Sequence, residues 1–312
     1  MTVTDGHFFP GTVATVNSVL RFQPEARIVA VNNHLHKTGL TPAQRGVLEA
    51  GGAAVIDAAA LAQPGRKLAA WELKAYAAAD LTTDDEVLVG IDSDCVLCGP
   101  VDDVIAAASA SGGFHGGRDG TATYDATYRV YGMPIPARNE NYISTSLYVC
   151  VLHEKNRAIL QKWALACDRA IFGGGGVYPG HGDQGVLNAV LFAERGAASA
   201  SVLDNRLWSQ HHCYWQEPLV VRDGARYNPA AHAWQRALHC GDGAEKFWTR
   251  DHLGKVLALG THDANYAWFL ALLWFGRARL EVEHLAAEHS HLVESFIRFR
   301  SQVADFLPSV RG

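Results

Sequence analysis

Strand signals and helix signals alternate through the first two-thirds of the chain, and this alternation is the strongest constraint on its fold. Between the first two strand signals, Thr41 is placed to cap a helix, with Pro42 in its first position and Gly51 just past its end. Repeated strand–helix units of this kind predict an α/β fold in which helices flank a sheet. The predicted strands cover residues 27–32, 53–57, 86–91 and 142–152.

The chain changes in character from about Thr249 onward. Residues 266–275 and 280–307 are predicted to be helical, because their apolar side chains recur with a helical period. We therefore divide the chain into a main α/β domain, residues 1–248, and a C-terminal helical extension, residues 249–312. The extension is expected to dock on the main domain or to form a homodimer. A role at a membrane surface is less favoured, because its polar positions carry glutamates where such helices carry basic residues.

Composition and charge narrow the class of protein. Of the 312 residues, 48% are hydrophobic, which is too many for a disordered chain. The 27 Lys and Arg against 32 Asp and Glu give a formal charge of -5, so nucleic acid is not the expected partner. The longest apolar run, residues 267–275, falls well short of the roughly 20 residues that span a bilayer. Because the first residues also lack the features of a signal peptide, we expect a cytoplasmic protein.

Six cysteines in a chain of this length do not indicate a disulfide framework. Cys95 and Cys98 form a C-x-x-C, but no second pair accompanies them at the spacing of a zinc site. A redox pair of the thioredoxin type usually opens a helix, whereas this one continues a strand. Both are expected to be small buried side chains.

The sharpest feature is the acidic motif Asp92-Ser93-Asp94, which directly follows the predicted strand over residues 86–91. In open α/β sheets, ligands bind at the carboxyl ends of strands. Where such a strand end bends, both carboxylates can converge on one hard cation, which prefers oxygen ligands. Because Pro100 then opens a helix, the context favours a metal site over a solvated acidic turn.

A second cluster lies in a glycine-rich stretch, where Asp183 and Gln184 open a predicted helix. Asp is a residue type that often caps a helix. Gln184 can donate hydrogen bonds to sugar hydroxyls and accept them, and its amide can face an anomeric carbon. Considered alone, the pair favours a capping role and a catalytic role about equally.

A third cluster runs from His239 to Lys246. A neutral imidazole can complete a metal site, and Gly241 and Gly243 let the backbone approach a phosphate. Lys246 supplies a positive charge for that phosphate. The chain has 15 histidines, so His239 stands out only because glycines and a lysine follow it at useful distances.

Taken in this order, the three clusters resemble the retaining glycosyltransferases of the GT-A fold that include glycogenin and the bacterial lipopolysaccharide galactosyl- and glucosyltransferases. That family carries a D-x-D motif, a D-Q-x-x-L-N element and a late H-x-x-G-x-x-K-P-W element. Its opening pattern is similar to Thr4, Phe8 and Gly11. The resemblance covers about residues 1–250 and implies a GT-A fold with a mixed sheet flanked by helices.

The chain departs from the family pattern at several positions. The spacing from His239 to Lys246 is one residue longer, and Phe247 replaces the proline. A strand that begins N-[SA]-G in the family begins here with Ser144 and Thr145. Metal and diphosphate binding therefore carry over better than the identity of the base, the sugar or the stereochemistry.

The resemblance implies transfer of a hexose from a nucleotide-diphosphate sugar, a UDP-sugar, to an acceptor hydroxyl with retention of configuration. It implies Mn²⁺ or Mg²⁺ bound by Asp92, Asp94 and His239, where the ion neutralises the leaving diphosphate. Asp183 and Gln184 would line the sugar as the catalytic residues. The residues implied in donor binding are Thr4, Phe8, Lys74, Asp92, Ser93, Ser144, Thr145, Gly241, Gly243 and Lys246.

Three alternatives remain open at this point. An inverting GT-A enzyme would need a carboxylate base near the acceptor hydroxyl, and Asp119, Asp125 and Glu140 are candidates. A sugar nucleotidyltransferase shares the general architecture but normally needs a basic glycine-rich loop after its first strand, where this chain reads DGHFFPGTVA. The third alternative is a non-catalytic metal- or nucleotide-binding module.

The acceptor is expected to lie over residues 111–141 and 204–236 and to be a glycan, a lipid-linked sugar or a small molecule. Aromatic side chains in these segments suit the faces of sugars, although packing of the domain explains them at least as well. These residues are Tyr124, Tyr128, Tyr131, Trp208, Trp215 and Trp234.

Overall fold

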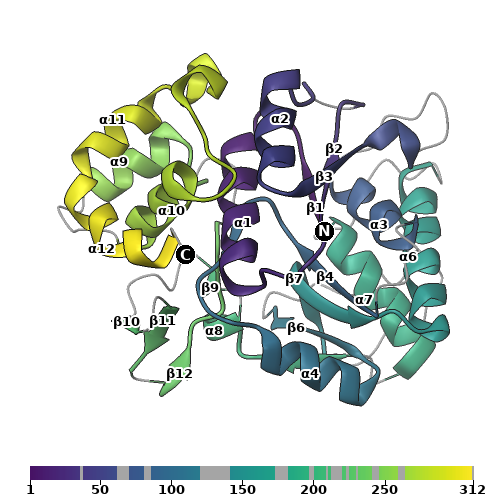
Figure 1. Ribbon diagram of the computed structural model, residues 1–312. Helices are drawn as coiled ribbons and strands as arrows, with labels where there is room; N and C mark the ends of the chain where they lie inside the picture. Colours follow the sequence, from purple (N-terminus) through teal and green to yellow (C-terminus); the bar gives the residue numbers. More distant parts are fainter. Residues whose placement is uncertain are drawn as a thin grey trace.

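The sheet of this computed structural model is built in two parts that lie side by side (Figure 1). In the first part, parallel strands lie in the order β1-β2-β3. In the second, the order is β4-β7-β6-β8, with β7 antiparallel to β4 and β6, and β6 parallel to β8. The strands are β1 (Thr2–Thr4), β2 (Ile28–Asn32), β3 (Ala53–Asp57), β4 (Val87–Ile91), β6 (Phe114–Arg118), β7 (Ile143–Val151) and β8 (Ser201–Leu203).

The structure describes most of the chain, and the statements below concern that part. The described residues are 1–35, 38–61, 70–80, 86–119, 141–172, 182–196, 200–208, 210–211, 220–222, 225–229, 231–240, 246–258 and 264–310. Within these ranges, the four predicted strands and the mixed α/β architecture are confirmed.

Met1 joins the two parts of the sheet. Its amino group donates to the carbonyl oxygen of Val89 at 2.8 Å, and the N–H of Ile91 donates to the carbonyl oxygen of Met1 at 3.0 Å. These two bonds place β1 beside β4. The carboxyl ends of both strands therefore open at the same edge of the sheet, where ligands bind in α/β proteins.

Side chains of β4 alternate between the two faces of the sheet. Val87, Val89 and Ile91 pack toward α4, whereas Leu88 packs toward α3, α6 and α7. Burial on both faces explains why this strand reads as a continuous apolar run. The helices are α3 (Ala70–Asp80), α4 (Asp102–Ser111), α6 (Glu154–Phe172) and α7 (Gly182–Arg195).

The helix predicted after Thr41 is α2 (Pro42–Ala50), and it begins with a capping box. The N–H of Gln44 donates to the Thr41 hydroxyl at 3.2 Å, while the Gln44 side-chain oxygen accepts from the Thr41 N–H at 3.0 Å. Cys95 and Cys98 are buried free thiols, as expected, and burial raises the pKa of Cys98 to about 12.

A short strand from the later part of the chain pairs with the strand that follows the acidic motif. β5 (Cys95–Leu97) pairs antiparallel with β13 (Ala237–His239), and this register places His239 opposite Cys95. A separate antiparallel sheet lies below them in Figure 1. The remaining strands are β9 (Gln210–His211), which pairs parallel with β13, then β10 (Val220–Arg222), β11 (Ala225–Asn228) and β12 (Ala233–Trp234).

The C-terminal segment differs from its prediction in one respect. The first predicted helix is confirmed as α10, but residues 280–307 are not one helical run. Leu285 and Ala286 adopt extended backbone (ψ 132° and 154°), which breaks the helical path although the apolar period continues through it. The elements are α9 (Arg250–Ala258), α10 (Ala264–Phe275), the 3-10 turns η5 (Val282–His284) and η6 (Ala287–His289), α11 (His291–Arg298) and α12 (Arg300–Val310).

The C-terminal segment packs against α1 (Phe9–Phe22), as Figure 1 shows. Asn17 of α1 is buried and makes three hydrogen bonds to backbone groups of this segment. Its amide nitrogen donates to the carbonyl oxygens of Leu272 at 2.8 Å and Ala278 at 2.9 Å, and its amide oxygen accepts from the N–H of Ala278 at 2.7 Å. Docking on the main part of the chain is therefore observed. Among the described residues, none of the helices has the length and apolar character needed to span a membrane.

Gly11 lies where α1 meets the acidic motif. A Cβ atom at this position would overlap the carbonyl oxygen of Ser93 and the ring of Trp248. By contrast, a Cβ at Gly46, on the exposed side of α2, would meet no atom within 4 Å. The two helical glycines thus form a matched pair.

We predict that Gly11→Ala lowers the free energy of unfolding by about 1–3 kcal/mol or more, because a backbone oxygen cannot move aside as a flexible side chain would. Gly46→Ala should instead raise it by about 0.5–1 kcal/mol, since alanine is the better helix former. Urea unfolding of both variants tests this. Equal effects of the two substitutions would contradict the packing described for Gly11.

Candidate functional site

A cavity of about 200 Å³ lies at the carboxyl ends of β1 and β4. Four carboxylates and two ammonium groups line it, which gives a formal excess of two negative charges. Such a lining favours an added cation. The lining residues are Val3, Thr4, Asp5, Phe8, Lys74, Asp92, Ser93, Asp94, Asp183 and Lys246.

The acidic motif forms the turn between β4 and β5. The N–H of Asp92 donates to the carbonyl oxygen of Ser146 at 2.8 Å, and the N–H of Cys95 donates back to the carbonyl oxygen of Asp92 at 2.9 Å. The carbonyl oxygen of Asp94 accepts from the N–H of Cys240 at 2.9 Å. Both neighbouring segments thus fix the backbone of the motif, and both of its carboxylates line the cavity.

The structure brings Asp92, Asp94 and His239 together. Each offers one ligand atom, and these atoms lie within 4.8 Å of one another. His239 Nε2 is 3.6 Å from a carboxylate oxygen of Asp94. Two carboxylates and one imidazole are a donor set that suits Mn²⁺ or Mg²⁺, so the residues fit such an ion.

Lys74 of α3 lies between two of the carboxylates. Its Nζ is 2.6 Å from Asp92 Oδ1 and 3.1 Å from Asp183 Oδ2. Burial by itself lowers the pKa of Lys74, but Asp183 and Asp92 outweigh it and raise the pKa above its ordinary value. The buried ammonium group therefore stays charged at neutral pH and links β4 to α7.

Lys246 takes the equivalent position beside Asp94. Its Nζ contacts a carboxylate oxygen of Asp94 and donates to the carbonyl oxygen of Cys240 at 2.9 Å. Burial raises the pKa of Asp94, but His239 and Lys246 outweigh it and hold that pKa well below its usual range. Asp94 is therefore ionised, as a metal ligand must be.

Asp183 and Gln184 begin α7 and are both nine-tenths or more buried. Asp183 Oδ2 accepts from the Thr145 hydroxyl at 3.0 Å, and the Asp183 carbonyl oxygen accepts from the Trp163 ring N–H at 2.9 Å. Burial raises the pKa of Asp183, with Lys74 acting against this rise and Asp92 adding to it. Asp183 lines the cavity, whereas Gln184 is not part of its lining.

The Gln184 amide is held at both ends. Its oxygen accepts from the N–H of Thr145 at 3.1 Å, and its nitrogen donates to Asp119 Oδ2 at 2.7 Å. The carboxylate of Asp119, one of the three candidate bases of an inverting enzyme, therefore accepts a hydrogen bond from Gln184. The other two candidates, Asp125 and Glu140, lie outside the described residues.

Thr4, Phe8 and Ser93, three more of the predicted site residues, line the cavity. Thr145 contacts Lys74, whose Nζ donates to its carbonyl oxygen at 3.3 Å. Ser144 is buried, with its hydroxyl 2.9 Å from that of Ser146, and it does not line the cavity. Gly241 and Gly243 lie outside the described residues.

Of the aromatic residues in the segments expected near an acceptor, Trp208 is a core residue, so packing of the domain explains it. Its side chain is 2% exposed, and its ring N–H donates to the carbonyl oxygen of Leu147 at 2.8 Å. Trp234 packs edge-on against Tyr227 in the small sheet. The others lie outside the described residues: Tyr124, Tyr128, Tyr131 and Trp215.

The sequence reasoning missed Asp5, which lines the cavity and organises the turn after β1. Asp5 Oδ1 accepts from the N–H groups of His7 and Phe8, both at 2.9 Å. This turn presents Phe8 to the cavity, where its ring packs edge-on against Trp248 with centroids 5.3 Å apart. An Asp directly after a strand is a common signal for such a turn and could have identified it.

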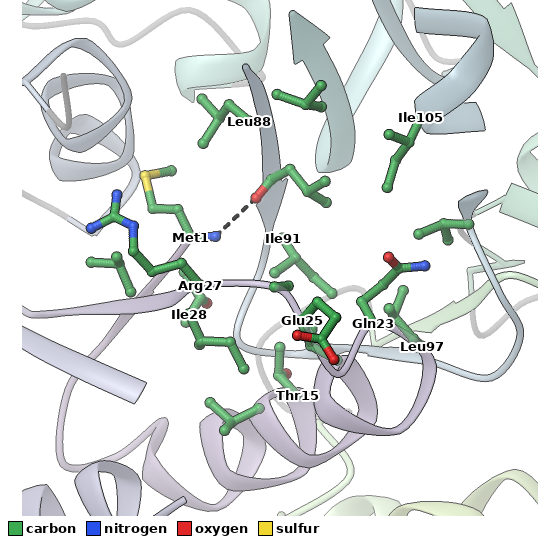
Figure 2. A pocket seen from close by; sticks show the side chains of 18 of the residues that line it. Met1, Thr15, Gln23, Glu25, Arg27, Ile28, Leu88, Ile91, Leu97 and Ile105 are labelled. Atoms are coloured by element: carbon green, nitrogen blue, oxygen red, sulfur yellow. Dashed lines mark hydrogen bonds between the residues drawn. The ribbon is translucent and has the colours of Figure 1, made fainter. Parts of the chain in front are cut away.

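A larger cavity of about 480 Å³, shown in Figure 2, is lined by residues along the length of β4 and by residues of α1 and β2. Its lining is mostly apolar, with Met1 and Arg27 on one side and Gln23 and Glu25 on another. The carboxylate cluster and the lysines belong to the smaller cavity, which makes that cavity the candidate site despite its size.

We predict that Lys74→Met lowers the free energy of unfolding by about 3–5 kcal/mol at pH 8, because Asp92 and Asp183 lose their shared counter-ion. Burial and Asp92 raise the pKa of Asp183, and without Lys74 to oppose them that pKa would lie further above the unfolded value, about 3.9. The cost therefore grows as pH rises through the folded pKa, so the loss should be smaller at pH 5. Urea unfolding in a chelating buffer at both pH values measures this.

Lys162→Met is the matched control for that substitution. Lys162 Nζ is also 2.6 Å from a carboxylate, that of Glu194, but the lysine side chain is 52% exposed. Its removal should change stability by less than about 1 kcal/mol at either pH. Similar losses for the two variants would contradict the role given to Lys74.

Comparison with known proteins identifies the fold. No family model and no curated protein sequence matches the chain. Among solved structures it is similar to the bifunctional glycosyltransferase WbbM (TM-score 0.57, 13% identity), covering 95% of this chain and 50% of that one. It is also similar to the galactosyltransferase LgtC in complex with donor and acceptor sugar analogs (TM-score 0.57, 14% identity), covering 87% of this chain and 94% of that one. An active-site mutant of LgtC gives a TM-score of 0.54 at 15% identity, covering 86% and 98%.

The chain thus spans half the length of the WbbM chain and nearly the whole length of LgtC. The chain has a GT-A-like fold, as its sequence predicts, shared with these glycosyltransferases.

Proposed function

We propose that this protein is a metal-dependent glycosyltransferase that moves a hexose from a UDP-sugar to an acceptor hydroxyl with retention of configuration. The observation that carries the proposal is the convergence of Asp92, Asp94 and His239 at the carboxyl end of β4. The excess negative charge of the cavity around them and the likeness of the fold to known glycosyltransferases support it.

The cation of this proposal is Mn²⁺ or Mg²⁺, bound by Asp92, Asp94 and His239. When bound, it supplies a Lewis acid that neutralises the charge on the leaving diphosphate. The three side chains come from the β4–β5 turn and from β13, and the pairing of β13 with β5 fixes their relative position. The protein therefore presents the ligands on backbone that hydrogen bonds already hold.

The two lysines provide the remaining positive charge. Lys74 and Lys246 bond carboxylates of the acidic motif, and a cation bound to those carboxylates competes for the same oxygen atoms. In our proposal Asp92 and Asp94 would hold the cation, and Lys246 would turn its ammonium group to the diphosphate. Fixed positive charge near developing negative charge is the main source of catalysis in such transfers.

The sugar of the donor is placed over Asp183. Its carboxylate lines the cavity on the side of Lys74 and would stabilise positive charge at the anomeric carbon as the leaving group departs. Gln184 lies beside it with its amide fixed by Thr145 and Asp119. Because Asp119 is engaged in this contact, we favour retention over an inverting mechanism that uses Asp119 as its base.

The aromatic ring of Phe8 would carry the base of the nucleotide. Phe8 lines the cavity and packs on Trp248, so one ring edge is fixed. Thr4 lies next to it, and its hydroxyl accepts from the Thr12 hydroxyl at 2.6 Å. A buried hydroxyl and an aromatic ring together suit a planar base with polar edges.

The proposal extends to the setting of the protein. We propose a cytoplasmic enzyme that acts on a glycan, a lipid-linked sugar or a small molecule. We also propose a homodimer formed through the C-terminal extension, residues 249–312, beside a catalytic unit of residues 1–248.

Chelation should abolish donor turnover, and added Mn²⁺ should restore it. Asp94→Asn should lower the rate about 100-fold or more, since it removes a ligand of the cation. Asp103→Asn is the control, because that carboxylate is 63% exposed and pairs with Arg236 away from the cavity. Release of nucleoside diphosphate from a panel of nucleotide sugars measures the rate. Full activity in excess chelator would exclude the metal site.

An α-linked donor should give an α-linked product, which proton NMR couplings identify. Gln184→Ala should lower kcat more than it weakens donor binding, because the amide helps most in the transition state. A β-linked product would show that the enzyme inverts the configuration and would contradict this prediction. A fall in donor affinity with kcat unchanged would assign Gln184 to binding alone.

A further inference from the structure

A second group of metal-binding side chains lies outside the candidate active site, where the turn after β1 meets η6. It consists of His7, Glu288 and His289, each of which offers one ligand atom within 4.8 Å of the others. We propose that these three residues form a second metal site that binds Zn²⁺. Two imidazoles and one carboxylate are a common zinc ligand set that leaves the fourth position to water.

The distances within the group suit a tetrahedral ion. His7 Nδ1 is 2.9 Å from Glu288 Oε1, and His289 Nε2 is 3.5 Å from the same oxygen. Zinc with bonds of about 2.0–2.1 Å holds its ligands about 3.3 Å apart, which lies between these two values. The His7 and Glu288 side chains are 50% and 58% exposed, so small rotations of both can complete the geometry.

The buried ring of His289 is a second, independent observation that points to a bound ligand. Its side chain is 2% exposed, yet neither ring nitrogen has a hydrogen-bond partner among the described residues. Buried polar atoms in folded proteins nearly always have a partner, so this ring calls for one.

Hydrogen bonds hold the backbone on both sides of the group. The N–H of His7 donates to Asp5 Oδ1 at 2.9 Å. His291 Nδ1 donates to the carbonyl oxygen of Glu288 at 3.1 Å. These bonds fix the backbone that carries His7 and Glu288, the two exposed members of the group.

The site would fasten the C-terminal segment to the wall of the donor cavity. Asp5 and Phe8 line that cavity, and His7 lies between them in the sequence. An ion shared by His7 and η6 would fix the turn that presents Phe8. Its proposed role is to hold this turn against η6, and its ligands are distinct from those of the acidic motif.

Zinc binding by untagged, metal-free protein tests this proposal. After equilibration with Zn²⁺ and gel filtration, elemental analysis gives the zinc retained, and titration gives its affinity. His7→Ala and Glu288→Gln change exposed side chains and should fold. Each should lose one zinc per chain or weaken its binding about a hundredfold or more. His34→Ala, which removes a partly exposed histidine elsewhere, should bind as wild type does.

Asp94→Asn separates this site from the acidic motif. It should keep the zinc that His7→Ala loses, and Zn²⁺ should raise its Tm as it raises that of wild type. Co²⁺ should give wild type a visible absorption band of tetrahedral character that His7→Ala lacks. Equal zinc stoichiometry and affinity in wild type, His7→Ala and Glu288→Gln would overturn the proposal. Loss of all bound zinc in Asp94→Asn would also overturn it.

Discussion

The ammonium group of Lys74 connects three elements that are far apart in the sequence. It sits on α3, bonds Asp92 at the end of β4 and bonds Asp183 at the start of α7. Without it, two carboxylates would face each other in a buried space, an arrangement that normally costs several kcal/mol. This charge therefore acts together with the bonds from Thr145 to Asp183 and Gln184 to hold α7 against the sheet and to shape the cavity.

The same carboxylates serve the fold and the proposed chemistry. Asp92 and Asp94 each bond a buried lysine, and each is also placed to bind a cation with His239. Binding of a cation therefore exchanges one set of counter-ions for another within a fixed frame of oxygen atoms. The frame holds because backbone bonds on both sides, and not the side chains themselves, fix the acidic turn.

The parts of the site that depend on local sequence were predictable, and the parts that depend on long-range packing were not. The apolar run that leads into Asp92 predicts a buried strand from local sequence alone. The resemblance to GT-A enzymes then indicates which later clusters belong to the same site. No local pattern shows that Trp208 packs in the core, since aromatic residues of core and surface segments look alike in sequence. The break in the helix after residue 284 could not be predicted from local sequence either. Leu285 and Ala286 are good helix formers, yet their backbone is extended in the folded protein.

The hydrogen bonds of Asn17 limit how the C-terminal segment can be exchanged during evolution. The N-terminal end of α1 follows the turn that carries Phe8. The middle of α1 carries Asn17, whose amide bonds backbone groups of Leu272 and Ala278 in the C-terminal segment. A replacement segment from another glycosyltransferase would have to present the same two carbonyl oxygens and one N–H at the same spacing. The C-terminal segment is therefore not an interchangeable module, and any lineage that exchanges it must alter α1 as well.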